Sequence, residues 1–162
     1  MKNIYVAASF AYADKNKTEE RKRLIKEVVD KIKTYLPGEY YLPQELKIEN
    51  AWDYSLEDWG RLVYIEDLMK LKTADIVIFI SFGKENNAGA VWEIGFAAGM
   101  NCILAASEAH SGWKNIIMIK MNNEPESLMV TNSVNTIITK DEIDTYDWKL
   151  RPWTKTSINK LS

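Results

Sequence analysis

The sequence predicts a doubly wound α/β domain built on a parallel sheet. Short apolar runs rich in β-branched residues alternate along the chain with amphipathic segments of helical period. The run at 74–81, ADIVIFIS, is almost wholly apolar, which is typical of a central parallel strand covered on both faces. Strands that alternate with helices favour one parallel sheet, and 162 residues suit one core. We therefore expect residues 1–162 to form a single domain.

The first part of the chain supplies two strands and a helix. Residues 3–9, NIYVAAS, predict a buried first strand. Apolar residues then recur every three or four positions from Thr18, until Pro37 and Gly38 end the helix. Residues 40–43, YYLP, predict a second strand. The buried stripe of the helix is expected to consist of Leu24, Ile25, Val28, Val29, Ile32 and Leu36.

The remaining elements complete a sheet of about five strands. A long helix is expected at 56–72, before the central strand, and another begins near Gly89. Residues 101–107, NCILAAS, are interpreted as a fourth strand and 115–120, NIIMIK, as a fifth. A further short strand is possible at 135–139, NTIIT.

Composition excludes several classes of function. With 21 basic and 23 acidic residues, the net charge of −2 does not indicate a nucleic-acid or anionic-membrane partner. A single cysteine, Cys102, and a single histidine, His110, exclude an internal disulfide and make a zinc site implausible. Cys–His catalysis stays formally open, although Cys102 lies in the run 101–107 and is expected to be an inert core thiol.

The apolar segments of the chain are better explained as parts of the fold than as a signal peptide or a membrane span. The N-terminal MKNIYVAASFAYA is too short and too often interrupted for a signal peptide, and a first strand explains it better. No unbroken apolar run approaches the roughly 18 residues of a membrane span. We expect a cytoplasmic protein.

Ligands of doubly wound sheets bind at the carboxyl ends of the strands, beside the switch in strand order. Three loops are thereby singled out, after Ser9, after Pro43 and after Ser81. None of them contains a phosphate-binding P-loop, a dinucleotide G-x-G-x-x-G or a G-x-S-x-G nucleophile elbow. This argues against a nucleotide kinase, a typical dinucleotide enzyme and an α/β-hydrolase.

Glu93 is the carboxylate that stands out. It falls in the first or second turn of the helix that begins near Gly89, where the helix dipole favours an ionised acid. Ala90 and Ala97 share its helical face and leave space above it. A solvated surface glutamate explains the position as well as a nucleophile does.

Asp67 is the second candidate. It lies in the later half of the helix at 56–72, where an acid opposes the helix dipole. It is either a surface charge paired with Lys70 or Lys72, or an acid facing the ligand. Two carboxylates flanking one pocket form the layout of glycosidic bond cleavage, in which one attacks the anomeric carbon and the other handles the leaving group's proton.

Along almost its whole length, the sequence resembles the nucleoside 2-deoxyribosyltransferases. The shared segments are IYVAASF, EDLMKLKTADIVI, NAGAVWEIGFAAGMNCIL, SLMVTNS and YDWKLRP. The most specific is AGAVWEIGFAAG, where family members carry D-x-G-x-x-x-E-[IL]-G. The resemblance implies a flavodoxin-like (Rossmann-like) fold and a homo-oligomer, dimer or hexamer, whose sites are completed by a neighbouring subunit.

The resemblance also implies roles for individual residues. Glu93 corresponds to the nucleophile that forms a covalent glycosyl ester, and Asp67 to the aspartate that faces the base and assists its protonation. Tyr5 corresponds to a tyrosine beside the nucleophile. Phe10 corresponds to an aromatic residue that contacts the base, although Ala11 replaces a second aromatic residue common there. No cofactor or metal is implied.

The substrate-binding residues are expected to be Ser9, Phe10, Asn87, Gly89 and Ser127. Nucleoside-using members carry Asp in place of Asn87, where it holds the sugar 5'-hydroxyl, and Asn in place of Ser127, which is lent to the neighbour's site. The related deoxynucleoside 5'-monophosphate N-glycosidases carry serine at both places. Neutral side chains can donate to a phosphate that a carboxylate would repel, so either substrate class fits.

Three functions follow as alternatives. The first transfers deoxyribose between a 2'-deoxynucleoside and a free nucleobase, in a salvage role. The second is a hydrolase that acts on 2'-deoxynucleoside 5'-monophosphates. The third is a module that binds nucleotides without turnover. The chain lacks the glycine- and arginine-rich first loop of some of those hydrolases, and its LMVTNS and YDW segments resemble the transferases, so transfer is the primary expectation.

Overall fold

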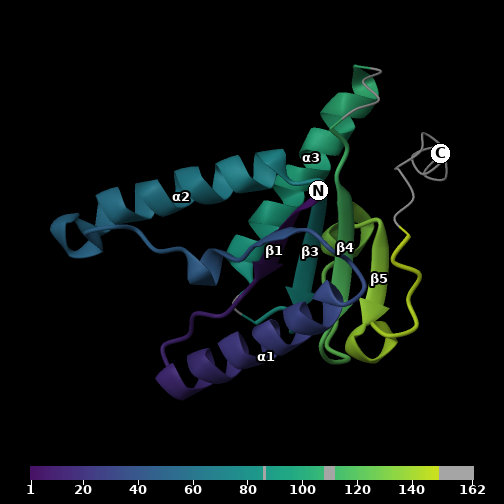
Figure 1. Cartoon of the computed structure of the whole chain (residues 1–162), viewed down its shortest axis with the longest axis horizontal. Coiled ribbons are helices and arrows are strands. Elements are labelled where there is room, and N and C mark those ends of the chain that lie inside the picture. The colour runs from purple at the N-terminus through teal and green to yellow at the C-terminus, as the bar shows by residue number, and fades with distance from the viewer. Residues whose placement is uncertain (86, 108–111, 150–162) are drawn as a thin grey trace.

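The computed structural model describes residues 1–85, 87–107 and 112–149, and its centre is one parallel sheet of five strands in the order β2-β1-β3-β4-β5 (Figure 1). The strands are β1 (Asn3–Ala8), β2 (Glu39–Tyr41), β3 (Ile76–Ser81), β4 (Asn115–Lys120) and β5 (Thr136–Thr139). The helices are α1 (Lys15–Lys33), α2 (Leu56–Thr73), α3 (Ala88–Ala106) and α4 (Leu128–Ser133). Short 3₁₀ turns lie at Pro43–Glu45, Ala51–Asp53 and Lys140–Glu142. The predicted fold class is confirmed.

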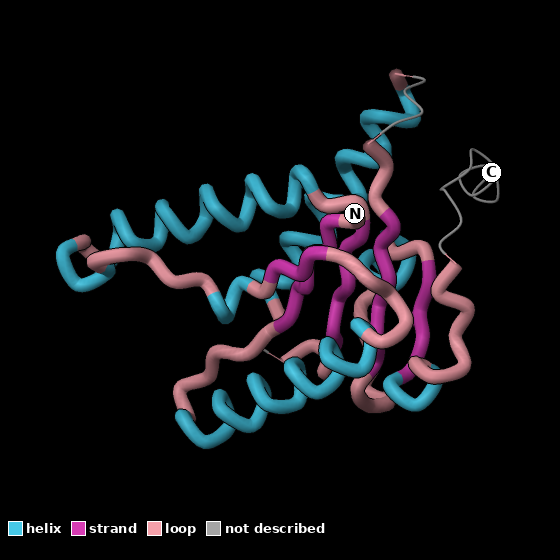
Figure 2. The backbone as a smooth tube through the Cα atoms, viewed as in Figure 1, coloured by secondary structure: helices cyan, strands magenta, loops and turns pink. Residues whose placement is uncertain are grey.

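Helices cover both faces of the sheet (Figures 1 and 2). Alternate residues of β1 point to opposite faces, so Val6 packs with Ile25 of α1 while Tyr5 and Ala7 pack with Ile94 of α3. Every residue of β3 is buried, as its unbroken apolar run predicts. Most of α2 extends beyond the sheet (Figure 1), and Leu71 is its one buried residue.

The strand order reverses at β1. The chain passes from β1 to β2 at one edge of the sheet and returns to β3 on the other side of β1. The loops after β1 and β3 therefore leave towards opposite faces at the carboxyl ends of these strands, where such sheets bind ligands. The start of α3 follows β3 at this same end.

The predicted strand at 101–107 is wrong, because these residues continue α3 to Ala106. As a strand, this segment would present apolar residues on both faces. However, no helix-breaking residue follows Gly99, and the alanines of the segment favour a helix. Asn101 then faces inward, where its side chain donates to the Lys114 carbonyl oxygen and accepts from the Lys114 amide, both at 2.9 Å. The possible strand at 135–139 takes the fifth place in the sheet as β5.

This longer helix changes two further expectations. Cys102 is exposed on α3 and is not a core thiol, while His110 lies outside the described residues. By length and composition alone, α3 also meets the criteria for a membrane-spanning helix, which the core helices of soluble proteins meet too. Ala90, Ile94 and Ala97 of α3 are packed into the core beside the sheet.

The start of α1 also differs from the prediction. The helix begins at Lys15, and Asp14 is its N-cap, accepting from the backbone amides of Asn16 and Lys17. Thr18 instead accepts from the Tyr12 amide at 3.0 Å and so shapes the loop before the helix. The expected stripe is confirmed on the helix itself, with Ile25, Val28, Val29 and Ile32 buried and Leu24 partly buried. Leu36 is also buried, but it lies after α1, which ends at Lys33 and not at Pro37 as expected.

Candidate active site

An open pocket of about 450 Å³ lies at the carboxyl ends of β1 and β2. Its walls come from the loops that follow these two strands, from the middle of α2 and from the first two turns of α3. Five of the predicted site residues line it, namely Ser9, Phe10, Asp67, Gly89 and Glu93. Residues remote in sequence are thus brought together at the edge that the strand order selects.

Two tyrosines from neighbouring strands form the floor beneath the carboxylates. Tyr5 of β1 is directly paired with Tyr41 of β2 in the parallel register. Paired residues of a parallel sheet project to the same face, and the two rings lie 5.4 Å apart between centroids. Both hydroxyl groups therefore reach the side of the sheet that carries α2 and α3.

Tyr5 holds Glu93. Its hydroxyl donates a hydrogen bond of 2.9 Å to Glu93 Oε1, and its ring is fully buried. Burial raises the pKa of Glu93 to about 8; the Tyr5 hydrogen bond acts in the opposite direction, and the charge of Asp67 adds to the rise. Burial also raises the pKa of Tyr5 far above its usual range, so this hydroxyl stays a donor. Glu93 is therefore not the solvated surface acid of the alternative interpretation.

Tyr41 holds Asp67 in the same way. Its hydroxyl donates to Asp67 Oδ1 at 2.6 Å. Burial raises the pKa of Asp67 from its ordinary value, against the lowering effect of this bond. Among the described residues no ion pair joins Asp67 to a lysine, and Lys70 instead pairs with Glu66 at 3.7 Å. The surface-charge interpretation of Asp67 is therefore not supported by its surroundings.

The outer part of the pocket suits a flat, partly apolar ring. Phe10 enters from the loop after β1, Leu46 and Ile48 from the loop after β2, and Trp59 from α2. These side chains offer apolar surface, and the carboxyl groups of Asp67 and Glu93 line the same pocket. Within the described residues, no three His, Cys, Asp or Glu side chains gather as a metal site would require.

Asn87 and Ser127 do not line this pocket. The Asn87 side-chain amide donates to the Gly83 carbonyl oxygen at 3.0 Å and to Glu126 Oε2 at 3.3 Å. Ser127 is exposed and caps α4, its hydroxyl accepting from the Val130 amide at 3.3 Å. Their predicted contacts with substrate stay predictions.

Three residues in or beside the site, Tyr41, Trp59 and Glu126, were not predicted from the sequence. Tyr41 lies at the carboxyl end of a predicted strand, beside one of the three selected loops, and that position was a usable signal. Trp59 lies two turns before Asp67 on the same helix, a spacing that returns to the same face. Nothing in the local sequence marks Glu126, because its partners come from other elements.

A family model described as nucleoside 2-deoxyribosyltransferase matches residues 4–129. The chain belongs to this family. The match includes Tyr5, Asp67 and Glu93, and ends just after Ser127. Membership supports an enzyme of the deoxyribosyltransferase kind, acting on a small nucleoside and a base. No protein with a curated description matches the chain.

Solved structures share the fold of this family member. A 2-deoxyribosyltransferase from the psychrotolerant bacterium Bacillus psychrosaccharolyticus matches with a TM-score of 0.64 and 22% identity, over 93% of this chain and 98% of that one. A conserved protein from Enterococcus faecalis V583 matches with a TM-score of 0.61 and 15% identity, over 90% of this chain and 98% of the other. At these identities the likeness shows the fold alone.

Proposed function

We propose that the protein transfers the 2-deoxyribosyl group between nucleobases through a covalent ester on Glu93. The observation that supports this most directly is the pair of carboxyl groups on one pocket, each held by its own buried or partly buried tyrosine. One carboxyl group is placed to attack carbon and the other faces the space for a base.

The proposed steps balance as follows. A Glu93 carboxylate oxygen bonds to C1' of the nucleoside while the C1'–N bond breaks, through an oxocarbenium-like transition state. The electron pair stays on the base nitrogen, and the base takes a proton from Asp67. A nitrogen of the second base then bonds to C1', the bond between C1' and Glu93 breaks and Glu93 leaves as carboxylate, and the N–H proton that the second base loses goes to Asp67.

The reactive form therefore carries a negative charge on Glu93 and a proton on Asp67. Burial raises the pKa values of both groups, and the charge of Asp67 raises that of Glu93 further, so the protonation of Glu93 depends on the state of Asp67. The Tyr5 hydroxyl favours the charged form of Glu93, because a hydrogen bond to an anion is stronger than one to a neutral acid.

The test is base exchange by Glu93→Ala, with Glu27→Gln on the exposed face of α1 as a control for loss of an acid elsewhere. We expect exchange between a deoxynucleoside and a free base to disappear in Glu93→Ala and to persist in the control. Mass spectrometry of acid-quenched wild-type protein should find a deoxyribosyl adduct on the Glu93 peptide. Unchanged exchange by Glu93→Ala would contradict the mechanism.

Water in place of the second base would give the hydrolase alternative, with a 5'-monophosphate as substrate. Free deoxyribose 5-phosphate from a monophosphate would favour that alternative, and a new deoxynucleoside would favour transfer. Ligand binding without any turnover would favour the non-catalytic module.

We also propose that a second copy of the chain covers α2, α3 and α4. Large apolar side chains are exposed on all three helices, and the rings of Tyr64, Trp92 and Phe96 form a continuous row across α2 and α3. Leu128 and Met129 are 79% and 82% exposed on α4, directly after Ser127, the residue expected to reach a neighbour's site. The family resemblance supports the choice of a second copy as the occupant.

Light scattering on the purified protein tests this oligomer. The variant Ile65→Lys/Leu128→Lys should lower the molar mass towards 18.7 kDa, because charges would be buried without partners. Tyr35→Lys, at an exposed position in the turn after α1, is the matched control. A wild-type monomer would refute the proposal.

A further inference from the structure

Glu126 holds an unexpected place beside the active site. Its carboxylate accepts from the Ser81 hydroxyl through Oε1 and from the Asn87 side-chain amide, at 3.3 Å, through Oε2. The other amide hydrogen of Asn87 goes to the Gly83 carbonyl oxygen. The end of β3, the start of α3 and the segment before α4 thus meet on one partly buried negative charge.

This charge lies at the end of the helix that carries the nucleophile. Asn87 is the residue before α3, and its carbonyl oxygen accepts from the Val91 amide at 2.9 Å. Gly89 and Ala90, in the first turn, line the pocket. A helix N-terminus ordinarily attracts a phosphate. Here the chain supplies an anion of its own at that position.

The orientation of the substrate follows from the proposed function, on which this inference rests. The base occupies the apolar part of the pocket near Asp67, and C1' lies over Glu93. The 5' carbon of deoxyribose is attached to C4', on the other side of the ring oxygen from C1' and the base. It is therefore directed away from α2, towards the first turn of α3 and Asn87.

We propose that Glu126, held by Ser81 and Asn87, makes the site select a free 5'-hydroxyl and reject a 5'-phosphate. A hydroxyl can donate to a carboxylate, directly or through water, whereas a phosphate dianion is repelled by it. Asn87 cannot turn its amide to a phosphate without giving up bonds to Gly83 and Glu126. Nucleoside-using family members carry an aspartate at this position, whereas Asn87 instead holds the carboxylate of Glu126 in place.

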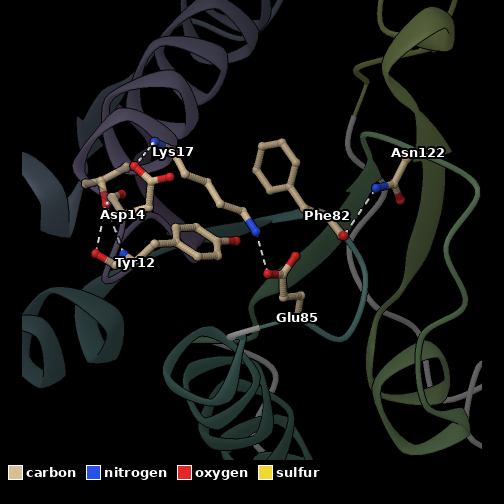
Figure 3. A network of polar contacts seen from close by, with 7 residues as sticks. Tyr12, Asp14, Lys17, Phe82, Glu85 and Asn122 are labelled. Carbon is tan, nitrogen blue, oxygen red and sulfur yellow. Dashed lines mark hydrogen bonds and ion pairs between the residues drawn. The ribbon is translucent and has the colours of Figure 1, made fainter.

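Two cations of this edge are already engaged. Lys17 at the start of α1 pairs with Glu85 in the loop after β3, as Figure 3 shows. The Arg21 guanidinium lies 3.7 Å above the centroid of the Phe82 ring. Because both cations are already paired within the chain, neither is positioned to bind a phosphate.

A purely structural role for Glu126, joining three segments, is the competing explanation. Glu126→Gln separates the two, because it keeps the size and one acceptor oxygen while removing the charge. Glu124→Gln is the matched control, since Glu124 is an exposed acid of the same segment. A structural role would change the melting temperature and leave the preference between substrates unaltered.

The experiment measures kcat/KM for a panel of deoxynucleosides and for their 5'-monophosphates, with calorimetric binding of the same ligands. We expect wild-type protein to prefer the nucleoside by about 100-fold, and Glu126→Gln to shift the ratio of the two constants towards the monophosphate by about 10- to 100-fold. Glu124→Gln should leave the ratio unchanged.

The outcomes are distinguishable from failure of the proposed function. Absence of turnover with every substrate would contradict the function, and the ratio of binding constants would then test Glu126 by itself. An unchanged ratio in Glu126→Gln, or a wild-type preference for monophosphates, would overturn the proposal.

Discussion

Replacing Tyr5 with phenylalanine isolates the contribution of one hydroxyl group to the acidity of Glu93. The Tyr5 ring is fully buried, and phenylalanine fills the same space, so the sheet should be preserved. The change removes the 2.9 Å hydrogen bond to Glu93 Oε1. Because that bond lowers the pKa of Glu93, its loss should raise the pKa above about 8.

The size of the effect follows from the energy of such a bond. A hydrogen bond to a charged group contributes about 1.5–3 kcal/mol, which corresponds to roughly one to two pKa units. With a pKa of about 8, about one Glu93 in ten is ionised at pH 7. In Tyr5→Phe the ionised fraction should fall a further 10- to 100-fold, and kcat/KM at pH 7 should fall with it.

The assay is the pH dependence of kcat/KM for base exchange. Activity needs ionised Glu93 together with protonated Asp67, so the profile should be bell-shaped. In Tyr5→Phe its maximum should be lower and its alkaline limb should move to higher pH, because the pKa of Glu93 rises. Tyr40→Phe is the control, because the Tyr40 hydroxyl donates to the Leu36 carbonyl oxygen outside the pocket. A Tyr5→Phe profile that is unchanged, or shifted to lower pH, would refute the reasoning.

Further predictions concern stability. Between the ordinary pKa of 4.5 and the folded value of about 8, folded Glu93 keeps a proton that the unfolded chain has lost, so stability should fall as pH rises through this window. Glu93→Gln removes this dependence, so the free energy of unfolding of the variant relative to wild type should rise by on the order of a few kcal/mol between pH 4.5 and pH 8. Urea unfolding at these two pH values measures the difference, and an equal dependence on pH in both proteins would contradict the prediction. Gly38→Ala should destabilise the fold by about 2 kcal/mol or more, because a Cβ there would lie 2.6 Å from the Lys2 carbonyl oxygen. Gly60→Ala, on α2 with nothing within 4 Å, should instead stabilise it by about 0.5–1 kcal/mol, and equal melting temperatures for the two variants would count against this account.

The sequence allowed the class of fold to be predicted, because it depends on local pattern. Local pattern singled out Glu93 and Asp67 by position, whereas only the family resemblance favoured site roles for them over surface charges. The apolar run of β3 and the period of α1 reveal their surroundings directly. The strand predicted at residues 101–107 was wrong because an apolar, alanine-containing run fits a buried helix as well as a strand. The choice between helix and strand depends on the Asn101 contact with Lys114. Local pattern carries no information about such a contact.

The partners of the carboxylates were harder to predict. Pairing Tyr41 with Tyr5 requires the register of the parallel strands β1 and β2, which the crossover through α1 and its packing decide. Glu126 depends on a loop that follows β4 and reaches back to β3 and α3. Local periodicity describes the faces of an element, and it does not describe which loops meet at its ends.

The two tyrosine–carboxylate pairs belong to parts of the molecule that should differ in local stability. Tyr5 lies on a strand with a neighbour on each side, and its amide should exchange with solvent only when the whole domain unfolds. Asp67 lies on α2, most of which is exposed in a single copy of the chain, so this helix should open at lower free energy when no second copy covers it. On warming, the wall that receives the base should therefore loosen before the nucleophile does. Discrimination between bases would then decline at temperatures where the glycosidic bond is still cleaved.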